Sequence, residues 1–173
     1  MQSNVRAKIQ AFGGFLTAMV IPNMGAFIAW GFITALFIPT GWIPNEQFNK
    51  LVGPMVSTLL PLLLAYAGGK LIYDTRGGIA GTIGTIGLIV GANIPMFLGA
   101  MIMGPLSAYI IKKFDGMIED KIPTGFEMLV NNFSLGIIGF ILCLLANSFI
   151  GPAVQEANNI ISIAIKALVS TGI

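Results

Sequence analysis

The sequence predicts an all-α polytopic membrane protein of about five transmembrane helices, including a glycine-rich helical hairpin, with a truncated helix at the C-terminal end. Hydrophobic residues fill 55% of the 173 positions and charged residues only 9%, against about 25% charged residues in soluble domains. The few charges fall in clusters that separate long uncharged runs, because a charge is costly in the hydrocarbon core of a bilayer. A net charge of +2 without a basic run excludes a nucleic-acid-binding protein, and the high hydrophobicity excludes a soluble or disordered chain.

Missing residue types limit the chemistry of the chain. It contains no histidine and a single cysteine, Cys143, which lies in an apolar run. A disulfide framework, a metal cluster of cysteine and histidine, and a histidine-dependent catalytic set are therefore excluded within these 173 residues. Cys143 is interpreted as a small packing residue rather than a nucleophile, since no nearby cation would activate it. We expect no catalytic residue, no metal ligand and no cofactor here.

The first uncharged run predicts a span over residues 11–38. It is too long for the apolar region of a signal peptide and has no obvious small-residue cleavage site, so we interpret it as retained. Pro22 removes one helical hydrogen bond, which predicts a kink near Ile21–Asn23. The turn that follows carries an interfacial tryptophan, Trp42. The next apolar run predicts a second span over residues 51–73.

The run from Gly77 to Ile111 predicts the helical hairpin. Its 35 residues would form about 52 Å of helix, short of two perpendicular crossings of a core about 30 Å thick. Two short or broken helices, over 77–92 and 95–111, are therefore expected, with the tip at Asn93–Pro95 because proline breaks a helix. Lysine and arginine counts place the N-terminus and the region of Lys112 in the cytoplasm, which leaves residues 128–151 as a span running outward.

Five glycines fall on one face of the first hairpin helix. Residues at this spacing lie within about 120° of one another on a helix. A face without side chains lets another backbone approach closely, so tight helix packing is our main interpretation. A surface along which helices slide during transport is the alternative. The five glycines are Gly77, Gly81, Gly84, Gly87 and Gly91.

Four polar residues in or beside the apolar runs are candidates for substrate binding: Asn93, Glu127, Asn131 and Asn132. Asn93 lies beside the break at the hairpin tip, where freed backbone groups could bind a polyol hydroxyl; a turn cap is the alternative. Glu127 and Asn131 share a helical face, and Asn132 lies on the next one. A carboxylate at the start of a membrane span, such as Glu127, indicates a functional role. A solvated or capping role for Glu127 is the alternative. The charge-balanced segment 112–123 is interpreted as a solvated inner loop, or alternatively as a docking surface for a soluble partner.

Four long segments read GFLTAMVIPNMGAFIAWGFITALFIPTGWIPNE, LVGPMVSTLLPLLLAYAGGKLI, GLIVGANIPMFLGAMIMGPL and GFEMLVNNFSLGIIG. These segments resemble the mannitol-specific permeases of the bacterial phosphotransferase system, and among these the cryptic variants of enteric bacteria. The resemblance extends from about Ala7 to Ile165. Runs of this length are far more specific than any single motif described above.

The resemblance implies an enzyme IIC component, a multi-pass protein in the lipid of the bacterial inner membrane. Such a component binds mannitol or a related hexitol and delivers it inward, while a phosphorylated cysteine of a IIB component phosphorylates the sugar. The family's N-terminal helices build a homodimer interface, and its sugar-site motifs with histidine and glutamate have no match here. Residues 1–173 are therefore expected to be the N-terminal scaffold and dimerisation part, as a fragment or a truncated product. The alternative function is a membrane dimerisation scaffold with no transport activity on its own.

Overall fold

The computed structural model describes residues 2–170, and every regular element in this range is a helix. The predicted all-α class is confirmed. Four helical stretches are long and apolar enough to cross a membrane: Val5–Phe37, Glu46–Val90, Phe97–Lys121 and Glu127–Ala157. The sequence predicts about five crossings, and the difference arises in the second stretch, which reverses direction in its middle and so contains two antiparallel helices.

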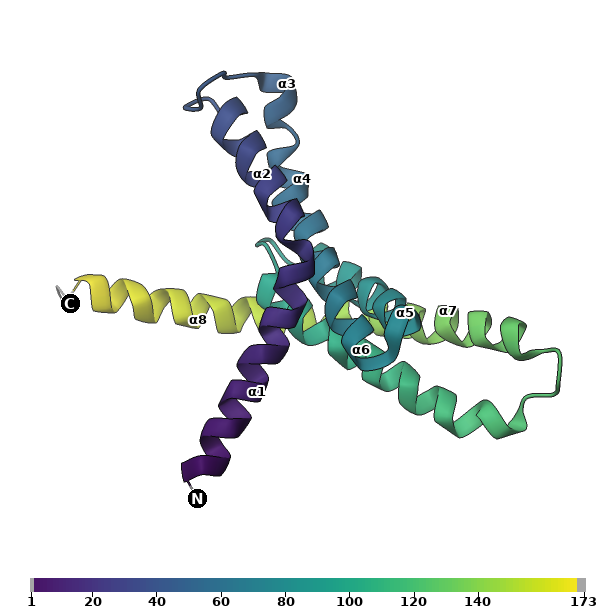
Figure 1. The fold of residues 1–173 in the computed structure, drawn as a ribbon. Helices are drawn as coiled ribbons and strands as arrows, with labels where there is room; N and C mark the ends of the chain where they lie inside the picture. The colour runs from purple at the N-terminus through teal and green to yellow at the C-terminus, as the bar shows by residue number, and fades with distance from the viewer. Residues whose placement is uncertain (1, 171–173) are drawn as a thin grey trace.

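The first stretch consists of α1 (Gln2–Val20), the 3-10 turn η1 (Ile21–Asn23) and α2 (Met24–Phe37). The 3-10 turn confirms the kink predicted at Pro22. The side-chain amide of Asn23 donates to the carbonyl of Met19 at 2.9 Å and to that of Leu63 at 3.1 Å. The kink is therefore also the point where this stretch is fastened to the next one (Figure 1).

The chain returns through α3 (Glu46–Asn49), α4 (Val52–Pro54) and the π-helix η2 (Met55–Leu59). The side chain of Asn45 caps α3 by accepting hydrogen bonds from two backbone amides, each at 3.0 Å. Trp42, in the turn before it, is 89% exposed, as a side chain at a membrane interface would be. Figure 1 shows α3 beside the far end of α2, so the two stretches form a long arm.

Helix α5 (Leu60–Val90) turns back on itself at Tyr73 and Asp74, whose backbone angles are not helical. Asp74 has φ +43°, a left-handed value that favours glycine. The two limbs pack antiparallel: the ring of Tyr66 lies over Gly78, and the carbonyl of Gly77 lies where a Cβ on Gly69 would be. The reversal therefore needs no loop, and it falls between the predicted spans 51–73 and 77–92.

The second limb of α5 and helix α6 (Phe97–Ile118) form the glycine-rich hairpin, with its turn at residues 91–96 as the sequence predicts. A Cβ on Gly81 would meet the backbone of Ala65 and Gly104, and one on Gly87 would meet the backbone of Cys143. The interpretation of the glycine face as a close-packing surface is confirmed. It meets three neighbours: the first limb of α5, α6 and the helix that follows.

That helix, α7 (Glu127–Leu145), continues through the π-helix η4 (Ala146–Ile150) into α8 (Gly151–Ser170). The core where α5, α6 and α7 meet contains Leu88, Met96, Met103, Leu142 and Ala146. Figure 1 shows α8 pointing away from the connection between α6 and α7.

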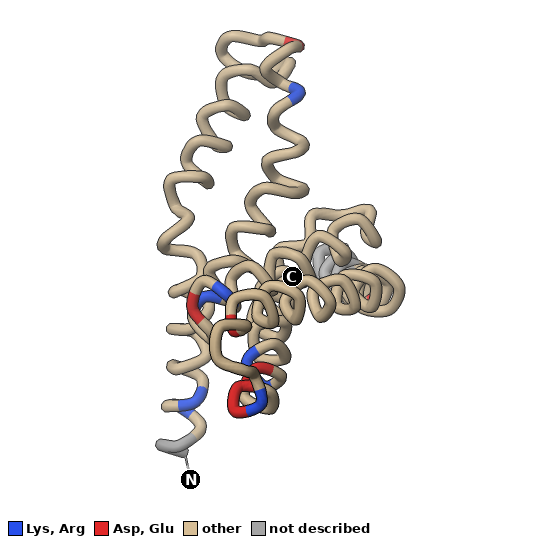
Figure 2. Tube along the Cα trace, turned by 90° about the vertical axis from the view of Figure 1, so that its right-hand side faces the viewer, with Lys and Arg blue, Asp and Glu red and all other residues tan. Residues whose placement is uncertain are grey.

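The charged residues lie in separate groups along the molecule. Figure 2 shows one group beside α3 and others around the N-terminal part and the α6–α7 connection, with a long uncharged stretch of the arm between them. The expectation of a solvated loop over 112–123 is wrong in its first part. Helix α6 continues to Ile118 before the short 3-10 turn η3 (Glu119–Lys121), and Asp115 is only 7% exposed.

Candidate functional site

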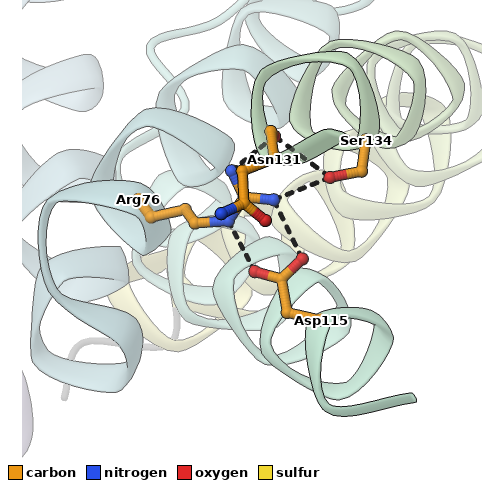
Figure 3. A network of polar contacts seen from close by, with 4 residues as sticks. All are labelled: Arg76, Asp115, Asn131 and Ser134. Carbon is orange, nitrogen blue, oxygen red and sulfur yellow. Dashed lines mark hydrogen bonds and ion pairs between the residues drawn. The ribbon is translucent and has the colours of Figure 1, made fainter. Parts of the chain in front are cut away.

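The buried carboxylate of Asp115, on α6, binds the guanidinium of Arg76, on the second limb of α5. The Nε–Oδ2 distance is 2.5 Å and the Nη2–Oδ1 distance is 2.9 Å, so the pair is bidentate (Figure 3). The side chains are 20% and 10% exposed. A planar fork of this kind holds a carboxylate more firmly than a lysine would.

Arg76 also reaches the third helix of the bundle, α7. Its Nη1 donates to the backbone carbonyl of Asn131 at 2.6 Å, and its Nη2 donates to the hydroxyl of Ser134 at 2.8 Å. The Ser134 hydroxyl in turn donates to the Asn131 carbonyl at 3.0 Å. A guanidinium has five N–H donors, and these bonds occupy four of them. Arg76 therefore ties α5, α6 and α7 together at the hairpin end opposite its tip.

A polar cavity of about 170 Å³ adjoins this network. Its wall includes three carboxylates, one guanidinium, one phenol and one amide; the lining residues are Tyr73, Arg76, Asp115, Glu119, Ile122, Glu127 and Asn131. Because oxygen acceptors outnumber cations, the cavity suits a neutral ligand that donates hydrogen bonds through hydroxyl groups better than it suits an anion. Among the described residues, no three carboxylate, thiol or imidazole side chains lie close enough together to hold a metal ion.

Two of the four predicted site residues, Glu127 and Asn131, lie on this cavity. Glu127 is the first residue of α7, and its Oε2 accepts the backbone N–H of Gly125, in the turn before the helix, at 2.8 Å. Asn131 is half-buried and gives its carbonyl to Arg76. Whether either residue contacts a substrate stays a prediction.

The other two candidates lie elsewhere. Asn132 is exposed and does not line the cavity. Asn93 is exposed at the hairpin tip, where its backbone N–H donates to the side-chain carbonyl of Gln155 at 3.3 Å. Residues 76 and 93 are separated by about 25 Å of helix, so the structure does not bring the four candidates together.

Sequence reasoning missed Arg76 and Asp115, which it treated as loop charges that mark the membrane boundary. A signal for their pairing was present. Arg76 lies 19 residues before Pro95 and Asp115 lies 20 residues after it, so a hairpin folded at that proline places the two opposite charges side by side. Ser134 lies seven residues after Glu127 and three after Asn131, a spacing that places all three on one helical face.

Comparison with known proteins agrees with this architecture. Residues 17–173 match the family described as Phosphotransferase system, EIIC. The chain is 64% identical over 169 residues to the PTS system mannitol-specific cryptic EIICB component of Escherichia coli strain K12, covering 98% of this chain and 37% of that protein. It is 60% identical to the mannitol-specific EIICB component of Geobacillus stearothermophilus, covering 97% and 36%. With the mannitol-specific EIICBA component of Klebsiella pneumoniae the identity is also 60%, covering 98% and 27%.

No solved structure matches the chain. The chain spans little more than a third of the length of the EIICB relatives, and its match runs through nearly all of the described helices. The resemblance to mannitol-specific permeases that the sequence motifs predict is confirmed. With the family matched over residues 17–173 and helices long and apolar enough to cross a bilayer, this chain belongs to the EIIC membrane family of the bacterial phosphotransferase system.

Proposed function

We propose that this chain is part of a permease that takes up mannitol, or a closely related hexitol, coupled to its phosphorylation. The observation that carries the proposal is the identity of 60–64% along almost the whole chain to proteins named as mannitol-specific components. Within such a permease, α5, α6 and α7 would form a rigid bundle, because the Arg76 network and the glycine face fix their mutual positions.

A phosphorylated IIB component is the proposed partner. The relatives' names join the letters C and B, or C, B and A, in one protein, which supports a IIB unit that works beside this membrane part. We place the N-terminus in the cytoplasm, supported by the basic residues Arg6 and Lys8 and by the lysines around the α6–α7 connection. This orientation puts the polar cavity at the cytoplasmic end, where a substrate leaving the membrane would meet it.

A homodimer is the proposed assembly, with the first helical stretch, Val5–Phe37, as its interface. No residue in the most apolar window of Val5–Phe37 is buried within the chain. Four glycines of this stretch have open space where a Cβ would be: Gly13, Gly14, Gly25 and Gly31. Surfaces of this kind allow close approach of a second helix in a bilayer.

Disulfide cross-linking tests the proposed dimer interface. Gly14→Cys in a Cys143→Ser background should give a cross-linked dimer band, whereas the control Gly116→Cys in the same background should not.

A chimaera tests the transport function. The matched segment of the Geobacillus stearothermophilus EIICB component is replaced by this chain, and uptake of labelled mannitol is measured in a strain without its own mannitol permease. We expect mannitol phosphate to accumulate at a rate within tenfold of the unmodified relative, and glucitol to compete weakly. A chimaera that reaches the membrane in normal amounts but accumulates no labelled product would overturn the proposal.

A further inference from the structure

A second cavity, quite unlike the polar one, lies between the C-terminal part of α6 and the first half of α7. It measures about 560 Å³, and its walls are almost entirely carbon, from side chains that include Phe114, Ile118, Val130, Phe133, Ile137 and Ile141. We call it the α6–α7 groove. Phe133 and Ile137 are 64% and 57% exposed, so the groove is open along its side.

The groove does not suit a polyol. The hydroxyl that reaches its wall belongs to Ser134, which already accepts from Arg76 and donates to the Asn131 carbonyl. A sugar alcohol placed here would leave its hydroxyl groups without partners, at a cost of about 1–3 kcal/mol each. An occupant must therefore be apolar along most of its length.

The length of the groove matches one leaflet of a bilayer. From Val130 to Ile141 on α7, the axial distance is about 16 Å at 1.5 Å per residue. Half of a hydrocarbon core about 30 Å thick is about 15 Å. The groove also begins at the polar α6–α7 connection, where α6 leaves its apolar stretch, so it runs inward from one membrane surface.

A single cation lies at the surface end of the groove. Lys121 is exposed and lines the groove together with Ile122 and Pro123. In the part of the chain that the structure describes, the one ion pair is Arg76–Asp115, so the Lys121 ammonium is not neutralised by a carboxylate there. The neighbouring Glu119 lines the polar cavity instead, and Asp120 lines neither cavity.

We propose that the α6–α7 groove binds one acyl chain of an anionic phospholipid, with the lipid phosphate at the ammonium of Lys121. The carbon walls, the length of one leaflet and the cation at the surface end each point to this occupant, since basic residues beside a membrane helix attract anionic headgroups. The inference needs only that the chain lies in a membrane. It does not depend on mannitol transport.

Native mass spectrometry tests the proposal on the chain purified from an equimolar mixture of dioleoyl phosphatidylglycerol and dioleoyl phosphatidylcholine. We expect one retained phosphatidylglycerol per chain, in at least fivefold excess over phosphatidylcholine. Lys121→Gln should abolish this preference. Lys113→Gln, the matched control, removes a cation of α6 that lies near the ring of Tyr109 rather than in the groove, and should keep the preference. Equal retention of both lipids by the unaltered chain, or loss of preference in both variants, would overturn the proposal.

A second measurement locates the acyl chain. Phe133→Trp, in a background with Trp30→Phe and Trp42→Phe, places the only tryptophan in the groove. Quenching of its fluorescence by phosphatidylglycerol brominated on the acyl chains should exceed quenching by the matching phosphatidylcholine at least twofold, and Lys121→Gln should remove the difference. Absence of quenching by either lipid would mean that protein, from a second copy or a partner, covers the groove, and the proposal would fail.

Discussion

Arg76 and Asp115 are 39 positions apart in the sequence, yet they meet on facing limbs of a hairpin whose turn lies midway between them. The pair is mostly buried, and two further donors of Arg76 reach the Asn131 carbonyl and the Ser134 hydroxyl. Each partner is thus the main neutralising group for the other.

Removing either partner should destabilise the bundle strongly. Arg76→Gln leaves the Asp115 carboxylate buried without its counter-charge, and a broken buried pair typically costs about 3–5 kcal/mol. We expect a marked fall in the midpoint of thermal unfolding in detergent, with a similar fall for Asp115→Asn.

The double variant Arg76→Gln with Asp115→Asn separates the pair from other effects. The fall in its unfolding midpoint should be clearly smaller than the sum of the falls in the two single variants, because no unpaired charge remains. Additive losses would mean that the two side chains act independently and that the pairing is unimportant for stability.

Replacing Asp74 by glycine should stabilise the chain. Asp74 holds φ +43° at the reversal of α5, and such a conformation costs a residue with a side chain about 1–3 kcal/mol. Asp74→Gly should raise the unfolding midpoint. Thr75→Gly, at the next position and with helical backbone angles, should lower it, since glycine costs about 0.5–1 kcal/mol inside a helix. A lower midpoint for both variants would contradict the strain argument.

Two glycines with opposite surroundings test the packing of the glycine face. A methyl group on Gly87 would collide with the backbone of Cys143 on α7, whereas one on Gly13 would meet open space. Gly87→Ala should therefore destabilise the bundle by about 1–3 kcal/mol. Gly13→Ala should be neutral or slightly stabilising, because alanine favours helix. Equal effects in thermal unfolding would show that α5 and α7 can separate without cost.

The adjacent residues Asn131 and Asn132 form a matched pair for the sugar prediction. Both are asparagines of α7, but only Asn131 lines the polar cavity. If substrate passes this cavity, Asn131→Ala should raise the KM for mannitol uptake by the chimaera about tenfold, while Asn132→Ala leaves it unchanged. Because the Arg76 bond uses the backbone carbonyl of Asn131, stability should not change. An unaltered KM in both variants would remove Asn131 from the candidates.

Features that depend on local chemistry were predictable from the sequence. Pro22 and Pro95 lie at the kink and the tip where the backbone cannot continue as an α-helix, and the glycine face required close neighbours whatever those neighbours were. The sequence predicts a break between the spans 51–73 and 77–92, but the tight reversal at Asp74 was harder to predict, because a non-glycine residue holds its left-handed angle. Its strain is offset by the packing of Gly69 against Gly77, which is a tertiary contact.

The site was predictable only in part, because its contacts are non-local. Glu127 and Asn131 could be placed on one face by helical spacing alone. The pairing of Arg76 with Asp115 required knowing that α6 continues as a helix past Lys112, whereas a balanced run of charges suggested a solvated loop. Asn93 was a reasonable candidate at a helix break, but a break at the opposite end of the hairpin cannot join a site near Arg76.

From residue 5 onward, helix α1 is held at its C-terminal end only. Residues 5–14 are all exposed, while Met19, fully buried over Gly68, and the Asn23 amide fasten its other end to α5. A swing of α1 would strain a few contacts, whereas a comparable shift of α6 would have to unpack a continuous seam of backbone against backbone. Helix α1 can therefore change its angle about residues 19–23 at a lower cost than α6 can shift.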